Sequence, residues 1–149
     1  MKGGIRIPLV LFESKVPVVK LNLGDREFFA LVDTGSESTL MDRELAGVDG
    51  IKEQKRDSEM SFVGIQGRTE DRRISILRGK FQYEESEIRI AGISADLSTI
   101  GEHFKRSYGS DIAISMLLGC DLLEIYNAVV DFDEHMLYLY NKNNEAVHN

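Results

Sequence analysis

Short apolar and β-branched runs, separated by turn residues, follow one another along most of the sequence. Ile5, Ile7, Leu9 and Leu11 alternate with other residues, which is typical of a strand with one buried face. Further strands are predicted over residues 16–23, 27–32, 60–63, 72–77, 79–83, 87–93, 111–118, 128–132 and 136–140, with helical segments at 41–45, 97–108 and 121–126. Strands and helices do not alternate regularly, so the pattern predicts an all-β fold, a closed β barrel with one or two short helices.

Length and charge limit the organisation and the partners. A chain of 149 residues predicts one domain, placed at residues 1–141 and followed by a polar tail at 142–149. The net charge of -7 repels phosphates, so a nucleic acid partner is not expected. No apolar run approaches the roughly 20 residues that span a bilayer, so no membrane partner is expected either. The single cysteine, Cys120, fits a reducing compartment, and a cytoplasmic location is the expectation.

A carboxylate stands at the end of the most apolar predicted strand. Phe28, Phe29, Leu31 and Val32 precede Asp33, and a strand this apolar is expected to be buried on both faces. It would deliver Asp33 in or beside the core, where a carboxylate must be hydrogen-bonded, paired or share a proton. The next three residues suit that need, because Thr34 and Ser36 carry hydroxyls and Gly35 allows a close backbone approach. An ordinary Asp-Thr-Gly turn is the alternative interpretation.

A second motif, Met116-Leu117-Leu118-Gly119-Cys120-Asp121-Leu122-Leu123, is an apolar strand that ends at a glycine before a short helix. Taken alone, it fits a strand, a tight turn and an amphipathic helix in any core. Its importance depends on its order and spacing relative to the Asp33 motif.

The two motifs together resemble those of retropepsin-like aspartic peptidases. Leu31-Val32-Asp33-Thr34-Gly35-Ser36 is similar to the active-site loop of that family, and Leu117-Leu118-Gly119 is similar to the later apolar pair and glycine beneath the loop. Residues 128–132 and 137–139 resemble the last strands of bacterial single-domain members, and Asp96-Leu97-Ser98 with the following helix also resembles that subgroup. The resemblance extends from about Ile7 to Tyr140 and implies an aspartic endopeptidase.

The resemblance implies a role for each residue of the loop. Asp33 would be the catalytic carboxylate, and Thr34 the threonine that hydrogen-bonds to a partner's loop. Gly35 would lie close to substrate, and Ser36 would be the small residue beside the carboxylate, with a hydroxyl able to bond Asp33. No cofactor is implied.

Peptide hydrolysis by this route needs two carboxyl groups, one ionised to take a proton from water and one protonated to donate to the scissile carbonyl. The chain has one Asp-Thr-Gly and no room for a second lobe, so a homodimer is expected to supply the second aspartate across a two-fold axis. Asp121 is the conceivable partner within the chain, but its neighbours lack the Thr-Gly pattern. It is interpreted as a helix cap.

A flap that closes over a peptide substrate is predicted at Ser61-Phe62-Val63-Gly64-Ile65-Gln66-Gly67. Gly64 and Gly67 would give a mobile hairpin tip, while Ile65 and Gln66 would contact substrate. An ordinary hairpin turn is the competing interpretation.

Other features of the sequence do not favour a further site. Cys120 has no histidine near it in sequence, so a half-buried structural cysteine is favoured over a nucleophile. The three histidines, His103, His135 and His148, lack metal-ligand spacing, so no metal site is predicted. The acidic residues Asp131, Asp133 and Glu134 fit a solvated turn better than a calcium loop, and the spacing between Gly64 and Gly67 is too short for a phosphate loop.

The sequence therefore predicts a homodimeric aspartic endopeptidase acting on peptides or proteins. The alternative is a catalytically inactive retropepsin-like module that binds peptides without cutting them. The intact Asp33-Thr34-Gly35-Ser36 favours the enzyme, because a pure binder has no evident need for that sequence.

Overall fold

The computed structural model describes residues 4–11, 16–57, 63–64, 67–68, 73–109 and 112–140. Its strands are β1 (Ile5–Pro8), β2 (Val10–Leu11), β3 (Pro17–Leu23), β4 (Arg26–Val32), β5 (Leu40–Asp42), β6 (Lys52–Asp57), β7 (Val63–Gly64), β8 (Gly67–Arg68), β9 (Arg73–Tyr83), β10 (Ser86–Ala95), β11 (Ile114–Leu118), β12 (Val129–Asp131) and β13 (Met136–Leu139). Two α-helices, α1 (Ser98–Tyr108) and α2 (Cys120–Ile125), and one 3₁₀ helix, η1 (Arg43–Gly47), complete it. The predicted tail and its boundary at residue 141 lie outside the described residues.

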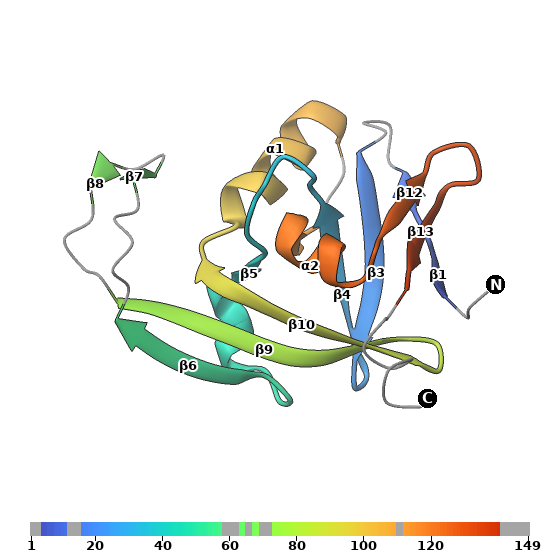
Figure 1. The fold of residues 1–149 in the computed structure, drawn as a ribbon. Helices are drawn as coiled ribbons and strands as arrows, with labels where there is room; N and C mark the ends of the chain where they lie inside the picture. Colours follow the sequence, from blue (N-terminus) through green and yellow to red (C-terminus); the bar gives the residue numbers. More distant parts are fainter. Residues whose placement is uncertain are drawn as a thin grey trace.

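Six strands form a closed barrel in the order β3-β4-β11-β5-β10-β9 (Figure 1). The ring closes where Asn22 of β3 pairs with Gln82 of β9. The short strand β2 attaches to β3, and β6 attaches to β9, outside the ring. The predicted all-β class, a closed barrel with short helices, is confirmed.

Apolar side chains fill the barrel and set which face of each strand points inward. On β4, Phe28, Ala30 and Val32 are buried in the main core, and the Phe28 ring meets Phe81 of β9 edge-on at 6.0 Å between centroids. Burial of side chains such as Phe28 and Val32 contributes roughly 1.5–3 kcal/mol each, so this face of β4 anchors the strand that leads to Asp33.

The opposite face of β4 is covered by helix α1. Phe29 and Leu31 pack, half-buried, against a second cluster that includes Phe104 of α1. This explains the continuous apolar run of β4, because the strand is covered on both sides as the sequence predicts. The helix begins at Ser98, one residue after the predicted start, and ends at Tyr108, with Gly109 as its C-cap at a φ of +65°.

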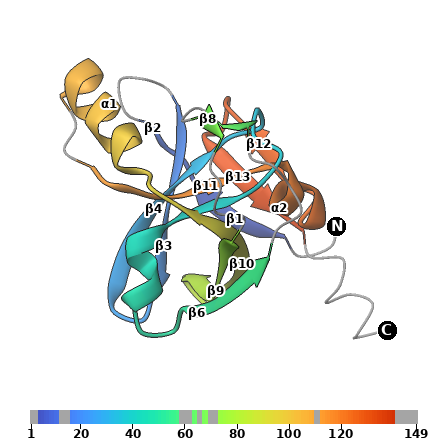
Figure 2. The same ribbon diagram turned by 90° about the vertical axis from the view of Figure 1, so that its left-hand side faces the viewer.

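A three-stranded sheet, β1-β13-β12, lies beside the barrel. Ile7 and Leu9 are buried and Ile5 is half-buried, which confirms the predicted alternation at these three positions, while the side chain of Leu11 is outside the described part. Between β12 and β13, Asp131 Oδ1 accepts the amides of Asp133 and Glu134 at 2.9 and 3.0 Å, so this acidic cluster is a hydrogen-bonded turn. Helix α1 and the α2–β12 region lie on different sides of the molecule (Figures 1 and 2).

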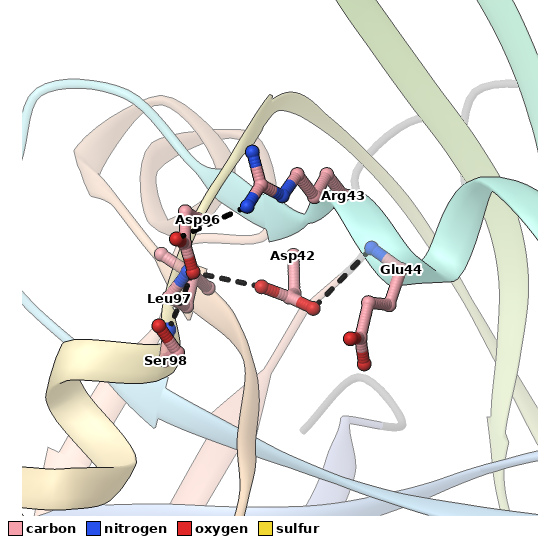
Figure 3. Close-up of polar contacts among 6 residues, drawn as sticks. All are labelled: Asp42, Arg43, Glu44, Asp96, Leu97 and Ser98. Carbon is pink, nitrogen blue, oxygen red and sulfur yellow. Dashed lines mark hydrogen bonds and ion pairs between the residues drawn. The ribbon is translucent and has the colours of Figure 1, made fainter.

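A cluster of polar contacts joins β5 and η1 to the start of α1 (Figure 3). Asp42 caps η1 by accepting the Glu44 amide at 3.3 Å, and its other oxygen accepts the Leu97 amide at 2.9 Å. Asp96 accepts the Ser98 amide at 3.0 Å and pairs with Arg43 at 3.3 Å. The hydrogen bonds from Ser98, with a smaller effect from Arg43, hold the pKa of Asp96 below its ordinary value of 3.8.

Several element boundaries differ from the sequence-based expectations. The segments predicted at 72–77 and 79–83 form one long strand, β9, because Gly79 packs its backbone under Ile51 without interrupting the ladder. The helical turn predicted at 41–45 is divided into strand β5 and helix η1. Strand β6 was not predicted, because all six of its side chains are exposed and leave no apolar alternation to read. Within the described ranges, no helix has both the length and the apolar character needed to cross a membrane.

Candidate active site

Asp33 begins a loop that passes over the end of β11. Strand β11 lies between β4 and β5, parallel to the first and antiparallel to the second. Residues 33–39 connect β4 to β5 and therefore cross the carboxyl end of β11. The loop is fastened at its start, where the Asp33 amide donates to the Leu118 carbonyl at 3.0 Å.

The middle of this loop rests on the turn between β11 and α2. The Cys120 amide donates to the Ser36 carbonyl at 2.8 Å, and the Asp121 amide donates to the Glu37 carbonyl at 3.1 Å. These two amides belong to the first turn of α2, where helical amides have no partner within the helix. The loop carbonyls thus accept hydrogen bonds from the first-turn amides of α2, and these bonds hold the loop in place.

Gly119 has no space for a side chain. A Cβ there would lie 2.5 Å from both the carbonyl carbon and the oxygen of Ser38, and 2.9 Å from the Ser36 oxygen. The glycine that the sequence places beneath the Asp33 loop is therefore required by direct backbone contact.

A buried threonine closes the loop at its far end. Among the described residues, Thr39 is the polar side chain that is buried, with 1% of its surface exposed. Its hydroxyl accepts the Gly119 amide at 3.1 Å and donates to Asp121 Oδ1 at 2.7 Å. Sequence reasoning did not single out Thr39. A threonine in a polar loop is unremarkable until the fold buries it.

Asp121 lies in the first turn of α2 and is not its N-cap, which is Gly119. The predicted capping role is therefore wrong in position, although the carboxylate does accept an amide of the first turn, that of Leu122, at 2.7 Å. The Thr39 hydroxyl is its second donor, so the Asp121 carboxylate holds the end of the loop against α2.

Asp33 is half-buried. Its Oδ1 accepts the Gly35 amide at 2.9 Å, and a Cβ on Gly35 would lie only 3.2 Å from that oxygen. Thr34 and Gly35 are exposed. The arrangement presents one carboxylate, held by a backbone amide, next to two residues that are accessible to another molecule.

Ser36 differs from expectation. Its hydroxyl donates to the Ser38 carbonyl at 2.7 Å instead of bonding Asp33, so the expected bond to the carboxylate is wrong. The reason is local: residues 36–38 turn back over Gly119, which brings the Ser38 carbonyl nearer to this hydroxyl. Ser36 therefore stabilises the loop that carries Asp33.

The structure describes only part of the predicted flap. Gly64 and Gly67 pair with each other in the β7–β8 hairpin, as a flap would require, while Ser61, Phe62, Ile65 and Gln66 lie outside the described residues.

Cys120 is half-buried, and its thiol donates to the Thr34 carbonyl at 3.1 Å. His148 lies outside the described ranges. Within them, no three His, Cys, Asp or Glu side chains gather into a metal-binding group.

Comparison with known proteins shows which solved structures this fold resembles. No protein-family model and no curated protein matches the sequence. Among solved structures, the retroviral protease-like domain of Ddi1 from Leishmania major matches with a TM-score of 0.51 at 16% identity, covering 85% of this chain and 90% of that one. A retropepsin-like aspartic protease from Rickettsia conorii matches with a TM-score of 0.50 at 17% identity, covering 93% and 91%.

These likenesses show that the chain has the retropepsin-like fold, as the sequence resemblance implied. They do not single out the bacterial subgroup, because one match is from a protozoan and the other from a bacterium.

Proposed function

We propose that this chain, with its retropepsin-like fold, is an aspartic endopeptidase that works as a homodimer. The observation that carries the proposal is the Asp33 loop. Hydrogen bonds to Leu118, Cys120 and Asp121 fix the loop, while Asp33 is half-buried beside exposed Thr34 and Gly35. A solvated turn would not need this support from a second segment of the chain.

The chemistry follows from the pairing of two such loops. One Asp33 carboxylate, ionised, takes a proton from a water molecule, and the water oxygen attacks the scissile carbonyl carbon. The second copy's carboxyl group, protonated, donates to the carbonyl oxygen. Two carboxyl groups at one site share a single proton because both cannot remain charged.

The neighbouring residues fit this scheme. The Gly35 amide on Asp33 Oδ1 fixes the orientation of the carboxylate, and the absence of a side chain at Gly35 leaves room for an extended peptide. By the family resemblance, the Thr34 hydroxyl bonds to the loop of the second copy. The β7–β8 hairpin with Gly64, Ile65, Gln66 and Gly67 is proposed as the flap over the substrate.

The direct test replaces the carboxylate at constant shape. Asp33→Asn is expected to lower the cleavage of a peptide library by at least about a hundredfold, the low end for losing a positioned acid or base. Asp25→Asn is the matched control, because Asp25 is exposed in the turn at the other end of β4 and loses the same charge. Cleavage by Asp33→Asn equal to that of the control contradicts the proposal.

A mixing experiment tests the shared site. When wild-type chains are refolded with a tenfold excess of Asp33→Asn chains, random pairing leaves roughly a tenth of the wild-type chains in fully wild-type dimers. Activity per wild-type chain should fall to about that level, whereas Asp25→Asn chains should not lower it. Retention of full activity would mean that each chain acts alone. Peptide binding that is unchanged by Asp33→Ala, without cleavage, would indicate a binding module instead.

A further inference from the structure

Cationic side chains gather on one face of the three adjacent strands β6, β9 and β10. Residues directly opposite each other in an antiparallel pair point to the same side of a sheet, and so do alternate residues along a strand. The register places Lys52 opposite Arg78 and Lys80 opposite Arg89. The basic face defined in this way consists of the exposed residues Lys52, Arg56, Arg78, Lys80 and Arg89.

The basic face is poorly neutralised. Among the residues of these three strands, Glu87 is the one carboxylate on the same side, and it pairs with Arg89 at 3.3 Å. No ion pair joins the other four cations to a carboxylate of the described residues. The whole chain has a net charge of -7, so this concentration of positive charge runs against its overall composition.

Two of the strand pairings bring like charges together. Lys52 lies directly opposite Arg78, and Lys80 lies directly opposite Arg89. Like charges in directly opposite positions destabilise a sheet. An anion bound on this face would offset the repulsion, so the arrangement favours a ligand with negative charge.

Gln54 holds two of the arginines at one point. Its Oε1 accepts Arg78 Nη1 at 2.8 Å and Arg56 Nη2 at 3.3 Å. The amide oxygen is neutral and leaves both guanidinium charges in place. A hydrogen bond from a guanidinium to a carboxylate is roughly twice as strong as one between neutral groups. Gln54 therefore positions two donors that an incoming carboxylate would bind more strongly.

Strand β6 also has an open edge. It stands at the end of the eight-stranded sheet and, among the described strands, pairs with β9 alone. Charged residues on such a strand often protect the edge from unwanted pairing. Protection requires charges on β6 only, whereas the basic face continues across β9 to β10. The edge of β6 is therefore suited to pairing with an added strand.

We infer that the edge of β6 and the basic face bind an extended, acidic segment of another protein. The segment adds a strand beside β6, and every second side chain is a carboxylate that meets Lys52, Arg56 or Arg78. Among the residues of β6, β9 and β10, none on this face is aromatic, so a nucleic acid base would have no ring to stack on. A long polyanion or an anionic membrane would also meet the negative charge of the rest of the chain.

This surface goes beyond the proposed function and does not rest on it. Strand β6 ends at Asp57 and β9 begins at Arg73, so the two strands flank the β7–β8 hairpin in the sequence. Figure 1 shows β6 and β9 along the lower edge of the molecule, with the hairpin beyond their ends. If the proposed function also holds, a substrate would dock its acidic segment here while a neighbouring stretch is cut.

Fluorescence anisotropy with a labelled peptide tests the inference. The probe alternates glutamate with threonine over about eight residues, which places all of its carboxylates on one face of a strand. The full chain is expected to bind this probe at least about tenfold more tightly than a version with glutamine in place of glutamate. Added salt should weaken the binding, because the contacts are exposed.

Two variants of the chain locate the site. Gln54→Glu keeps the shape and gives the two arginines an internal carboxylate, while Arg78→Glu reverses one charge. Each is expected to raise the dissociation constant of the probe by about fivefold or more. Arg106→Glu is the matched control, because it reverses a charge at an exposed position on α1 and should change the constant by less than about twofold. Circular dichroism and thermal unfolding check that the variants are folded.

The possible results are distinct from those for the active site. Failure of the wild type to bind the probe, or equal binding by Gln54→Glu and Arg78→Glu, overturns the inference. Single-stranded DNA or anionic phospholipid vesicles that bind as tightly as the probe overturn the choice of a protein segment. A probe methylated on alternate backbone nitrogens should bind more weakly, and unchanged binding overturns the added strand. Asp33→Asn should bind the probe as the wild type does, so this surface stands or fails independently of catalysis.

Discussion

The hydroxyl of Thr39 donates to Asp121 Oδ1 over 2.7 Å and links two segments that are 82 residues apart in the sequence. The Thr39 hydroxyl oxygen also accepts the Gly119 amide. This bond ties the end of the Asp33 loop to the first turn of α2, so the geometry of the candidate site depends on a buried polar group that is not itself part of the reacting surface.

Replacing Thr39 by valine keeps the shape and removes the hydroxyl. Thr39→Val leaves the buried Gly119 amide without its acceptor, which costs about 1–3 kcal/mol of unfolding free energy. Thr39→Ser keeps the hydroxyl and should lose about 1 kcal/mol or less, for one methyl group. Urea unfolding of the two variants measures the difference. Equal stability of valine and serine variants would show that the hydrogen bonds contribute nothing.

Adding a methyl group to Gly119 forces the loop to move. Gly119→Ala places a Cβ 2.5 Å from the Ser38 carbonyl, and the resulting strain costs about 1–3 kcal/mol. Because Ser38 belongs to the Asp33 loop, peptide cleavage should fall more than stability alone explains, measured at a temperature where the variant is fully folded. Gly47→Ala is the control, because a Cβ there meets no atom within 4 Å.

Removing the phenolic oxygen of Tyr126 should destabilise the protein. The Tyr126 hydroxyl accepts the Arg89 amide at 2.8 Å and donates to the Arg89 carbonyl at 3.3 Å. Tyr126→Phe leaves both backbone groups without this partner, at a cost of about 1–2 kcal/mol in urea unfolding at pH 7. Tyr83→Phe, in a half-buried position on β9, serves as a control for loss of a phenol.

The same tyrosine predicts a loss of stability in alkali. Burial raises the pKa of Tyr126 above its ordinary value of 10.0, while hydrogen bonding to Arg89 opposes the shift. The unfolded chain therefore loses this proton before the folded protein does. The stabilisation is complete below pH 10 and declines as the pH rises through the folded pKa. Unfolding free energies from pH 8 upward should fall more steeply for wild type than for Tyr126→Phe, and parallel curves would contradict the assignment.

Asp42 should contribute to stability through two backbone amides. Asp42→Ala removes the acceptor for Glu44 and Leu97 and is expected to cost about 1 kcal/mol, as for loss of a helix cap (Figure 3). Asp49→Ala, at an exposed turn position, should change the unfolding free energy by less than about 0.5 kcal/mol. A thermal unfolding series of the two variants makes the comparison.

The sequence predicts the class of fold because its strands carry their own patterns. The apolar run before Asp33, the strands predicted at 16–23 and 27–32, and the helix predicted at 97–108 are all found in the structure. Strand β6 has no such pattern, since its backbone pairs with β9 while all its side chains face solvent. Barrel closure at Asn22 and Gln82 is a single pairing between distant residues, and neither residue type marks it.

The sequence likewise predicts some residues of the candidate site and misses others. Asp33, Thr34 and Gly35 are adjacent in sequence, so one motif places them together. The roles of Thr39 and Asp121 depend on long-range contact, and a hydroxyl or carboxylate gives no sign of such a partner. The family resemblance assigned the Ser36 hydroxyl to Asp33, but in the structure that hydroxyl donates to the Ser38 carbonyl.

Residues 33–39 cross the carboxyl end of β11, and this arrangement also determines when the site can form during synthesis. The amides of Cys120 and Asp121 hold the loop, so a growing chain that ends before them has its Asp33 segment unsupported. Contacts across such a long stretch of sequence form late, since the entropy of closing the intervening chain must first be overcome. A growing chain on the ribosome that ends before Cys120 therefore lacks the organised loop, and the carboxylate is set in place only after the first turn of α2 has been made.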